Sequence, residues 1–588
     1  MNESGEIVKL PGTDAVIPDA QSVASHRPSS GRRIAGKVIG LFTVLALSAF
    51  TVIVMHVRAD GTFGIGTREE RLMTVMQFVV WFFVFVVSWK VLNLVDRYAA
   101  EKDTAAPVSE DEPAPKARRH FLFCWNLPGV IVTALLLLCL FYPYMYAYYP
   151  GVSSLDTTNM IKDYVTDTMP IEINWRPDEP KVSCFLNDHH PVTDTLIFVY
   201  FTEILGSKLG PQEGTYIYTC IQAGLTALFM SLLLCRMEKW GVPFLYRLAG
   251  FLYLGLMPFI PLYVIGMLKD SLHCMFYIPY FLVYLAIVRE GATHPRMILL
   301  ILLSLLLSLT RKTGLYLILI CNIALILIPS VRRKLAGWAA SWLAPALVLL
   351  VIMPNLIFPA FNIFPGGNQE KLGFTLQMSV QAYIDHKDQM TKQEIDALKG
   401  VLDLDAAEEN FYYLNYDDVK HLFKFNATDQ AIHTYVRTWL RLFLRFPRSG
   451  IKALFGTAGG FFTPTERIRI YYKFQKNSYT QVENLEEREP YRTVVADFYD
   501  WLNTQQGIGI LLQCVLYMWW LPLFALLRIL LKPEFRGKRF EYLMCMLPTA
   551  VSIAFLWISP YSMARYGLPI LYTLPMILGL SSTKTSGR

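Results

Sequence analysis

Apolar runs of about 20 residues, separated by short polar segments, make up most of this chain. Runs of that length are long enough for a helix to cross the hydrocarbon core of a bilayer. We place about twelve such helices, which predicts an all-α polytopic membrane protein. The predicted spans are residues 34–55, 73–95, 121–146, 216–234, 244–268, 271–288, 296–310, 314–329, 337–358, 506–531, 538–558 and 563–581.

The polar segments divide the chain into five parts. Residues 1–30 are rich in Ser, Pro, Gly and Asp and predict a disordered tail. Residues 359–505 form the longest polar stretch and predict a small, mainly helical extracytoplasmic domain. Its helix signals are a capping box at Thr391–Glu394 and an amphipathic repeat from Thr428 to Phe446. The predicted parts are the tail 1–30, an accessory two-helix segment with a cytoplasmic linker (31–120), a membrane core (121–358) containing an outer loop (147–213), the domain 359–505, and the last spans with a short tail (506–588).

Basic residues at the span ends set the orientation, because Lys and Arg are enriched in cytoplasmic loops. Arg32-Arg33, Arg118-Arg119 and Arg332-Arg333 fall on one side of the membrane under this arrangement. It predicts a multi-pass plasma-membrane protein with both termini in the cytoplasm and its active site on the outer face. The stretch 192–209, which carries Asp194, could be counted as a span, but the following basic segment would then lie outside. The charge rule therefore favours a juxtamembrane helix lying in the interface.

Composition narrows the function classes. Of 588 residues, 54% are hydrophobic and 17% are charged, and the mean hydropathy is +0.35. Soluble domains are about one quarter charged, so a soluble enzyme is excluded. The net charge of +7 comes largely from span ends, and no nucleic-acid partner is expected. The nine cysteines show no CxxC spacing, so the sequence predicts neither a disulfide framework nor a zinc site.

Two pieces of the outer loop carry candidate chemistry. The first is Tyr149-Pro150-Gly151 followed by Asp156, and the second is Asp188-His189-His190-Pro191. An ionisable cluster between spans is a candidate functional site. Asp156 could serve as a general base tuned by a nearby histidine, or it could simply cap the helix that follows. The histidine pair could likewise only begin the next helix, and Asp188 is best interpreted as that helix's N-cap.

Cations on the outer side form a second group. Lys269-Asp270 and Arg311-Lys312 lie between predicted spans, and Arg565 lies in a further outer loop. Two cations in a short outer loop run against the charge rule, which favours an anionic ligand such as a phosphate. Alternatively, these cations bind lipid headgroups, and Lys269-Asp270 forms a tight-turn pair.

The order and common outer placement of these motifs resemble the GT-C superfamily of integral-membrane glycosyltransferases. The resemblance runs over residues 121–581 and extends to a largely uncharacterised bacterial family of GT-C-like proteins. It rests on the Pro150-Gly151…Asp156 stretch, His189-His190-Pro191, Asp270, Arg311-Lys312-Thr313-Gly314 and Gln377.

The resemblance implies an inverting transfer of a sugar from a polyprenyl-phosphate donor to an envelope glycan, lipid or protein acceptor, in contact with membrane lipids. It implies Asp156 as catalytic base, flanked by His189 and His190. The implied donor-phosphate residues are Arg311, Lys312, Arg565 and Lys269, and the implied second carboxylates are Asp188 and Asp270. No cofactor follows with certainty, although a divalent metal is compatible with the outer carboxylates and histidines.

Other functions remain open at this point. A polysaccharide polymerase or ligase would use the same outer face and the same lipid phosphates. A transporter of lipid-linked envelope precursors would place ionisable residues near the bilayer midplane. A non-catalytic scaffold leaves the outer cations unexplained. The polar insert 159–186 contains further carboxylates, which leaves the choice of base open.

Overall fold

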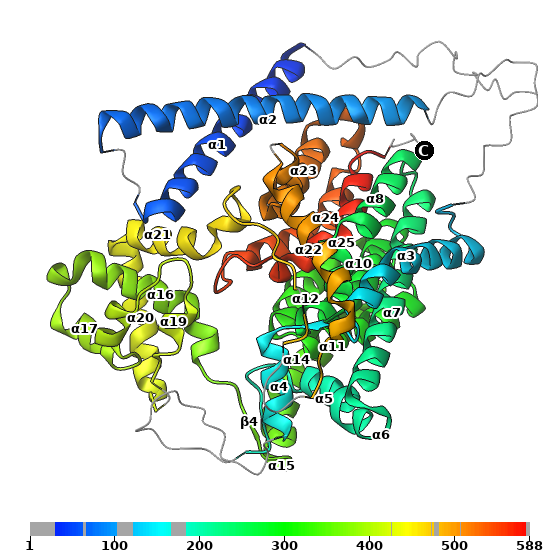
Figure 1. The fold of residues 1–588 in the computed structure, drawn as a ribbon. Helices are drawn as coiled ribbons and strands as arrows, with labels where there is room; N and C mark the ends of the chain where they lie inside the picture. Colours follow the sequence, from blue (N-terminus) through cyan, green and yellow to red (C-terminus); the bar gives the residue numbers. More distant parts are fainter. Residues whose placement is uncertain are drawn as a thin grey trace, which may run out of the picture.

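The computed structural model describes residues 30–62, 66–102, 122–165, 184–424, 426–471, 473–475, 481–505 and 507–583. The predicted tail, the linker at 103–121 and the part of the polar insert at 166–183 lie outside these residues. Within them the chain is almost wholly helical, with four strands of two residues each (Figure 1). The protein is therefore an all-α membrane protein.

Long helices run through the core of the bundle. α10 (Lys269–Glu290) is its most buried candidate span, with 78% of its apolar window covered. It packs against α7 (Pro211–Lys239), α11 (His294–Thr310), α24 (Arg539–Leu556) and α25 (Leu568–Leu580), while α3 (Leu127–Ala147) packs on α7. Burial of apolar side chains between these helices gives one continuous core.

The apolar helices of the structure fall into two groups by length. Among the described residues, seven helices are long and apolar enough to cross a membrane: Val38–Ala59, Arg68–Ala99, Leu127–Ala147, Pro211–Lys239, Lys269–Glu290, Leu335–Ala360 and Arg539–Leu556. Four shorter apolar helices lie at Phe244–Leu256, His294–Thr310, Lys312–Leu327 and Leu516–Leu531. The count of about twelve stays a prediction.

The structure refines the prediction for two apolar stretches. The run 244–268 is not one helix but α8 (Phe244–Leu256) and α9 (Phe259–Val264). Met257 is extended because Pro258 follows it and disfavours the helical conformation at the preceding residue. The juxtamembrane stretch 192–209 is helical along its length, with α5 (Val192–Val199) continuing through a π-helical turn (Tyr200–Ile204) into α6 (Gly206–Leu209).

An N-terminal hairpin lies against the last helices of the chain (Figure 1). It consists of α1 (Ser30–Asp60) and α2 (Arg68–Lys102). Trp81 of α2 packs on Trp520, and Asp96 forms ion pairs with Arg528 and Lys532 at the end of α23 (Leu521–Leu531). The hairpin is thus joined to the bundle by aromatic and ionic contacts.

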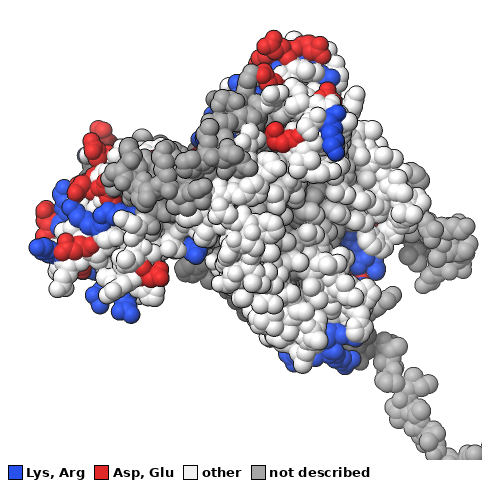
Figure 2. Space-filling model, turned by 90° about the horizontal axis from the view of Figure 1, so that it is seen from below, with Lys and Arg blue, Asp and Glu red and all other residues white. Residues whose placement is uncertain are grey.

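The segment after the core forms a helical lobe with its own apolar core. Its helices are α16 (Gln369–His386), α17 (Lys392–Lys399), α18 (Leu404–Glu409), α19 (Asp417–Lys420), α20 (Asp429–Arg445) and α21 (Pro447–Ala458). The predicted capping box at Thr391 and Glu394 is confirmed, and the predicted amphipathic helix is present as α20, with Thr428 as its N-cap. Figure 2 shows charges of both signs gathered on the lobe at the left, where Figure 1 places α16–α20, while the middle of that face is largely uncharged.

The chain then returns to the bundle. The described parts of 459–485, which are 459–471, 473–475 and 481–485, contain little regular structure. They are followed by α22 (Glu489–Thr504), a π-helical turn (Leu516–Trp520) and α23. Near the C-terminus a short 3-10 turn, Ala564–Gly567, leads into α25. This turn carries Arg565 into the candidate site.

Candidate active site

The Pro-Gly stretch is held by short-range backbone pairing. β1 (Val152–Ser153) pairs in parallel with β3 (Gly266–Met267), the residues that lead into α10. Gly151 has a φ of +151°, and a Cβ there would lie 2.7 Å from Thr219 Oγ1. Only glycine fits this combination of backbone angle and close approach. The pairing therefore places the start of α4 beside the start of α10.

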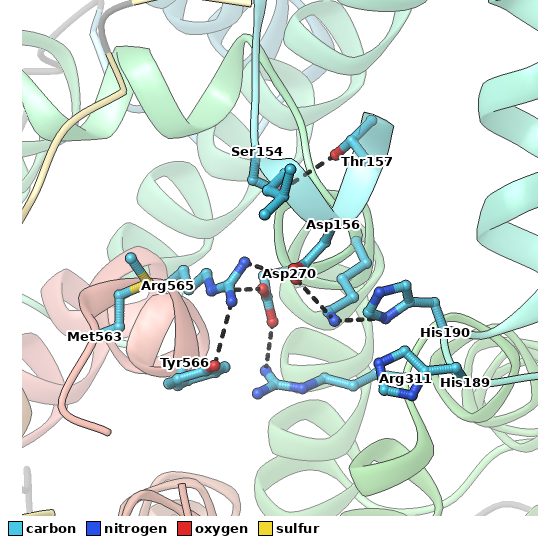
Figure 3. A network of polar contacts seen from close by, with 12 residues as sticks. Ser154, Asp156, Thr157, His189, His190, Asp270, Arg311, Met563, Arg565 and Tyr566 are labelled. Atoms are coloured by element: carbon cyan, nitrogen blue, oxygen red, sulfur yellow. Dashed lines mark hydrogen bonds and ion pairs between the residues drawn. The ribbon is translucent and has the colours of Figure 1, made fainter. Parts of the chain in front are cut away.

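Asp156 lies at the meeting point of three elements that are far apart in sequence. It is in the first turn of α4 (Leu155–Val165). Its Oδ2 atom is 3.0 Å from Lys269 Nζ, at the start of α10, and 2.8 Å from Arg565 Nη1 (Figure 3). The carboxylate thus pairs with two cations from distant parts of the chain, which favours the site interpretation over a purely capping role.

Asp270 forms a second, deeper charge pair in the same cluster. It is 1% exposed, and neither carboxylate oxygen has a hydrogen-bond partner. Arg311 Nη1 lies 3.4 Å from Oδ1 and Arg565 Nε lies 3.7 Å from Oδ2. Arg565 Nη2 also donates to the Tyr566 hydroxyl at 3.3 Å. Arg565 thus bridges both carboxylates, as Figure 3 shows.

The electrostatics of Asp156 follow from these neighbours. Burial alone would raise the pKa of the Asp156 carboxyl, but the charges of Lys269 and Arg565 outweigh burial and hold that pKa well below its usual range. Asp156 is therefore ionised, and as long as both cations contact it, it is a weak base. A ligand that drew these cations away would raise its basicity.

The histidine pair stands beside this cluster. His190 Nδ1 lies 2.9 Å from Lys269 Nζ. An ammonium only donates, so Nδ1 accepts and the proton of the neutral ring sits on Nε2. Burial lowers the pKa of His190 well below its usual value, and burial lowers the pKa of His189 to about 4. Both rings are therefore neutral near pH 7.

His189 connects the cluster to the helical lobe. Its Nδ1 lies 3.4 Å from Glu370 Oε1 at the start of α16. Glu370 is also 3.1 Å from Lys420 Nζ of α19. β2 (Leu186–Asn187) supports this junction by pairing in parallel with β4 (Ile363–Phe364). The lobe is thereby fixed against the loop that carries both histidines.

Lys312 lies apart from the cations around Asp156. Its Nζ is 3.0 Å from Asp188 Oδ2 and also donates to the Asp188 carbonyl oxygen. Pro191 directly precedes α5, and the Asp188 carboxylate accepts a hydrogen bond from the backbone N–H of Val192, the first residue of that helix. Asp188 thus satisfies one of the N–H groups at the start of α5, which supports the capping role predicted for it.

The cluster around Asp156 has a surplus of positive charge. Lys269, Arg311 and Arg565 supply three positive charges, and Asp156 and Asp270 supply two negative ones. Burial raises the pKa of the neighbouring Asp194 carboxyl well above its usual value, so Asp194 is counted as neutral. With both histidines also neutral, one positive charge remains unbalanced. The arrangement can therefore accept an anion and also offers a carboxylate beside it.

Several residues of the site carry no signal in the sequence. Asn484 donates to the carbonyl oxygens of Tyr148, Tyr149 and Gly151, and so holds the Pro-Gly stretch from the distant 459–485 segment. In the sequence, Tyr566 is marked only by its position next to Arg565. Glu370 is one of many charged residues in the predicted domain, and nothing in the sequence distinguishes it from the others. Their roles depend on contacts between distant segments.

A metal site is not formed by these side chains. Among the residues the structure describes, no group of three or more His, Cys, Asp or Glu side chains lies close enough to hold an ion. The carboxylates of the cluster face Lys and Arg instead of each other. The carboxylates of the cluster are thus held by lysine and arginine side chains.

Comparison with known proteins places the chain in a family. No curated protein and no solved structure matches it. One family model, described as a family of unknown function, matches residues 27–586, which includes the N-terminal hairpin as well as the bundle and the lobe. The chain therefore belongs to the family of unknown function DUF6020.

Proposed function

We propose that the protein is a membrane glycosyltransferase that uses a polyprenyl-phosphate-linked sugar and acts on the outer face of the membrane. Its acceptor would be an envelope glycan, lipid or protein. The observation that carries the proposal is the position of Asp156, a carboxylate held between Lys269 and Arg565 in a cluster with surplus positive charge. Such a site can bind a phosphate and present a base next to it.

Charge balance supports a monophosphate donor. A polyprenyl-phosphate sugar is a phosphodiester with one negative charge, which matches the one unbalanced positive charge of the cluster. A donor linked through a diphosphate carries more negative charge than this surplus. Polymerases and ligases that use diphosphate donors are therefore the less favoured class.

The reaction would proceed by direct displacement. The donor phosphate competes for Lys269 and Arg565, so Asp156 is freed and its pKa rises. Asp156 then takes the proton of the acceptor hydroxyl while that oxygen bonds to the anomeric carbon and the bond from that carbon to the phosphate oxygen breaks. The phosphate monoester gains one negative charge, Asp156 becomes neutral, and the cluster remains balanced by Arg311, Arg565 and Lys269.

The helical stretch after His190 offers a place for the lipid chain. A shallow depression of about 350 Å³ begins three residues after His190 and is lined by Thr193, Leu196, Ile197, Tyr200 and Phe201. Leu196 is 47% exposed and Tyr200 is 49% exposed. An apolar surface of this kind, on the helix that follows the histidine pair, suits a donor whose anchor is a hydrocarbon chain.

The test is a direct assay of the purified full-length protein. It is incubated with a panel of radiolabelled polyprenyl-phosphate sugars and, in parallel, diphosphate-linked sugars, together with a cell-envelope extract as acceptor. We expect label transfer and release of polyprenyl phosphate from one monophosphate donor, and none with Asp156→Asn. Transfer from diphosphate donors alone would make the protein a polymerase or ligase. No transfer and no binding of any donor would refute an enzymatic role at this cluster.

A further inference from the structure

We propose that Arg58, at the end of α1, is a positioning residue for Arg565, so that the N-terminal hairpin is part of the scaffold of the site. This goes beyond the proposed function, because it assigns a role to the two helices that the glycosyltransferase resemblance leaves out. It also holds for any ligand that the cluster around Asp156 takes.

The side chain of Arg58 is buried where three segments meet. It is 8% exposed, and Glu466 Oε2 lies 3.2 Å from its Nη2. Its Nε donates to Thr465 Oγ1 at 2.9 Å, and its Nη1 donates to the Gly456 carbonyl oxygen at 2.5 Å and to Ser562 Oγ at 3.4 Å. One guanidinium thus joins α1 to α21, to the segment after α21 and to the loop that precedes Arg565. Only arginine has a planar group with several N–H donors at fixed angles, so lysine could not make the same set of contacts.

Ser562 transmits this contact to the site. Besides accepting from Arg58, its hydroxyl donates to the Thr457 carbonyl oxygen at 2.7 Å and accepts from the Gly460 backbone at 3.0 Å. Arg565 follows three residues later, in the turn that brings its guanidinium to 2.8 Å from Asp156. A hydrogen-bonded anchor three residues away restricts where that guanidinium can lie.

The same segment also reaches the other half of the site. It runs from Glu466, the partner of Arg58, to Gln475, whose backbone N–H donates to Ser153 Oγ at 2.8 Å. Ser153 ends β1, three residues before Asp156. Arg58 therefore contacts the loop that carries Arg565 and also the segment that leads to the hydrogen bond with Ser153, close to Asp156.

Close packing shows that α1 is fitted to this junction and does not merely touch it. A Cβ on Gly459 would lie 2.5 Å from Val54 Cγ1 and 3.0 Å from Arg58 Cδ. The Tyr413 hydroxyl of the helical lobe donates to the Arg58 carbonyl oxygen at 2.8 Å. The family match also begins at residue 27, before α1, so the hairpin belongs to what the family has in common.

Hydrogen–deuterium exchange on the detergent-purified full-length protein tests this. In Arg58→Ala, amide exchange in 558–567 should rise about tenfold or more, while exchange in 392–409 of the lobe stays as in the wild type. Ser562→Ala removes the three hydrogen bonds of the Ser562 hydroxyl, leaves the contacts of Arg58 with Gly456, Thr465 and Glu466 in place, and should give the same local increase in 558–567. Arg469→Ala is the matched control, because Arg469 also pairs with Glu466, at 3.3 Å, but its side chain is 67% exposed.

Unchanged exchange in 558–567 in both Arg58→Ala and Ser562→Ala would overturn the proposal. An equal increase with Arg469→Ala would also overturn it, because loss of any Glu466 partner would then suffice. Binding of a polyprenyl monophosphate is measured on the same samples, and Arg58→Ala should weaken it at least about fivefold through the misplaced Arg565. If the wild type binds no polyprenyl phosphate, the proposed function fails, and the exchange data alone decide the role of Arg58.

Discussion

Replacing Asp156 by asparagine separates the two roles that the cluster combines. The amide keeps the shape of the side chain but removes the charge that lies 3.0 Å from Lys269 and 2.8 Å from Arg565. The cluster then carries two unbalanced positive charges instead of one. We therefore expect binding of the phosphate and turnover to change in opposite directions.

The magnitudes follow from the geometry. Loss of a general base lowers turnover by ~100-fold or more. At the same time, the substitution removes a negative charge that would repel a bound phosphate about 4 Å away. Loss of that repulsion favours phosphate binding by ~1 kcal/mol where water screens the charges, and by more where it does not. Polyprenyl phosphate should consequently bind about fivefold more tightly to Asp156→Asn than to the wild type.

Two assays on the same preparations measure this. Turnover is followed as label transfer from the donor identified in the panel, and binding is followed by titration of a polyprenyl monophosphate in detergent. Asp188→Asn is the matched control, because it removes a carboxylate that also lies 3.0 Å from a lysine, Lys312, in the neighbouring pair. It should leave both quantities within about threefold of the wild type.

Two results would refute the reasoning. Near-normal turnover by Asp156→Asn would remove this residue from the chemistry, and if Asp188→Asn were then inactive the base would lie in the histidine segment. Weaker phosphate binding by Asp156→Asn would show that its carboxylate orders Lys269 and Arg565 for the ligand and does not compete with it.

Three further predictions test the neighbouring residues and the orientation. Arg565→Ala should weaken polyprenyl phosphate binding at least tenfold, at ~1.5–3 kcal/mol for a lost charge-assisted contact, whereas Lys312→Ala should have a smaller effect because Lys312 is engaged by Asp188. Burial lowers the pKa of His189 to about 4, so the unfolded chain binds a proton there first as pH falls from about 6.5, and stability should drop over that range. His189→Gln should accordingly lose less Tm than the wild type between pH 7 and pH 5, and an equal loss would contradict this assignment. Cysteines placed at Gly400 and Gly537, both exposed, should be labelled from outside intact cells only at 400, and labelling at 537 would reverse the orientation.

Sequence alone determined the class of the protein and much of its local structure. The apolar runs identified an all-α membrane protein, because helix length and hydropathy are properties of single segments. The capping box at Thr391 and the end of α20 before Pro447 were likewise readable, since both depend on residues a few positions apart. The outer-loop residues Asp156 and His190 and the distant cation Arg565 were singled out as well, but only as separate candidates.

Tertiary structure decided which of those candidates meet. Asp156, Lys269 and Arg565 come from three elements up to 409 positions apart, and only the pairing of β1 with β3 and the turn before α25 bring them together. It also separated Lys312 from this group and engaged it with Asp188, although Lys312 is the immediate neighbour of Arg311. Adjacent residues at a helix start point in different directions, whereas distant ones can converge, and no pattern along the chain records that geometry.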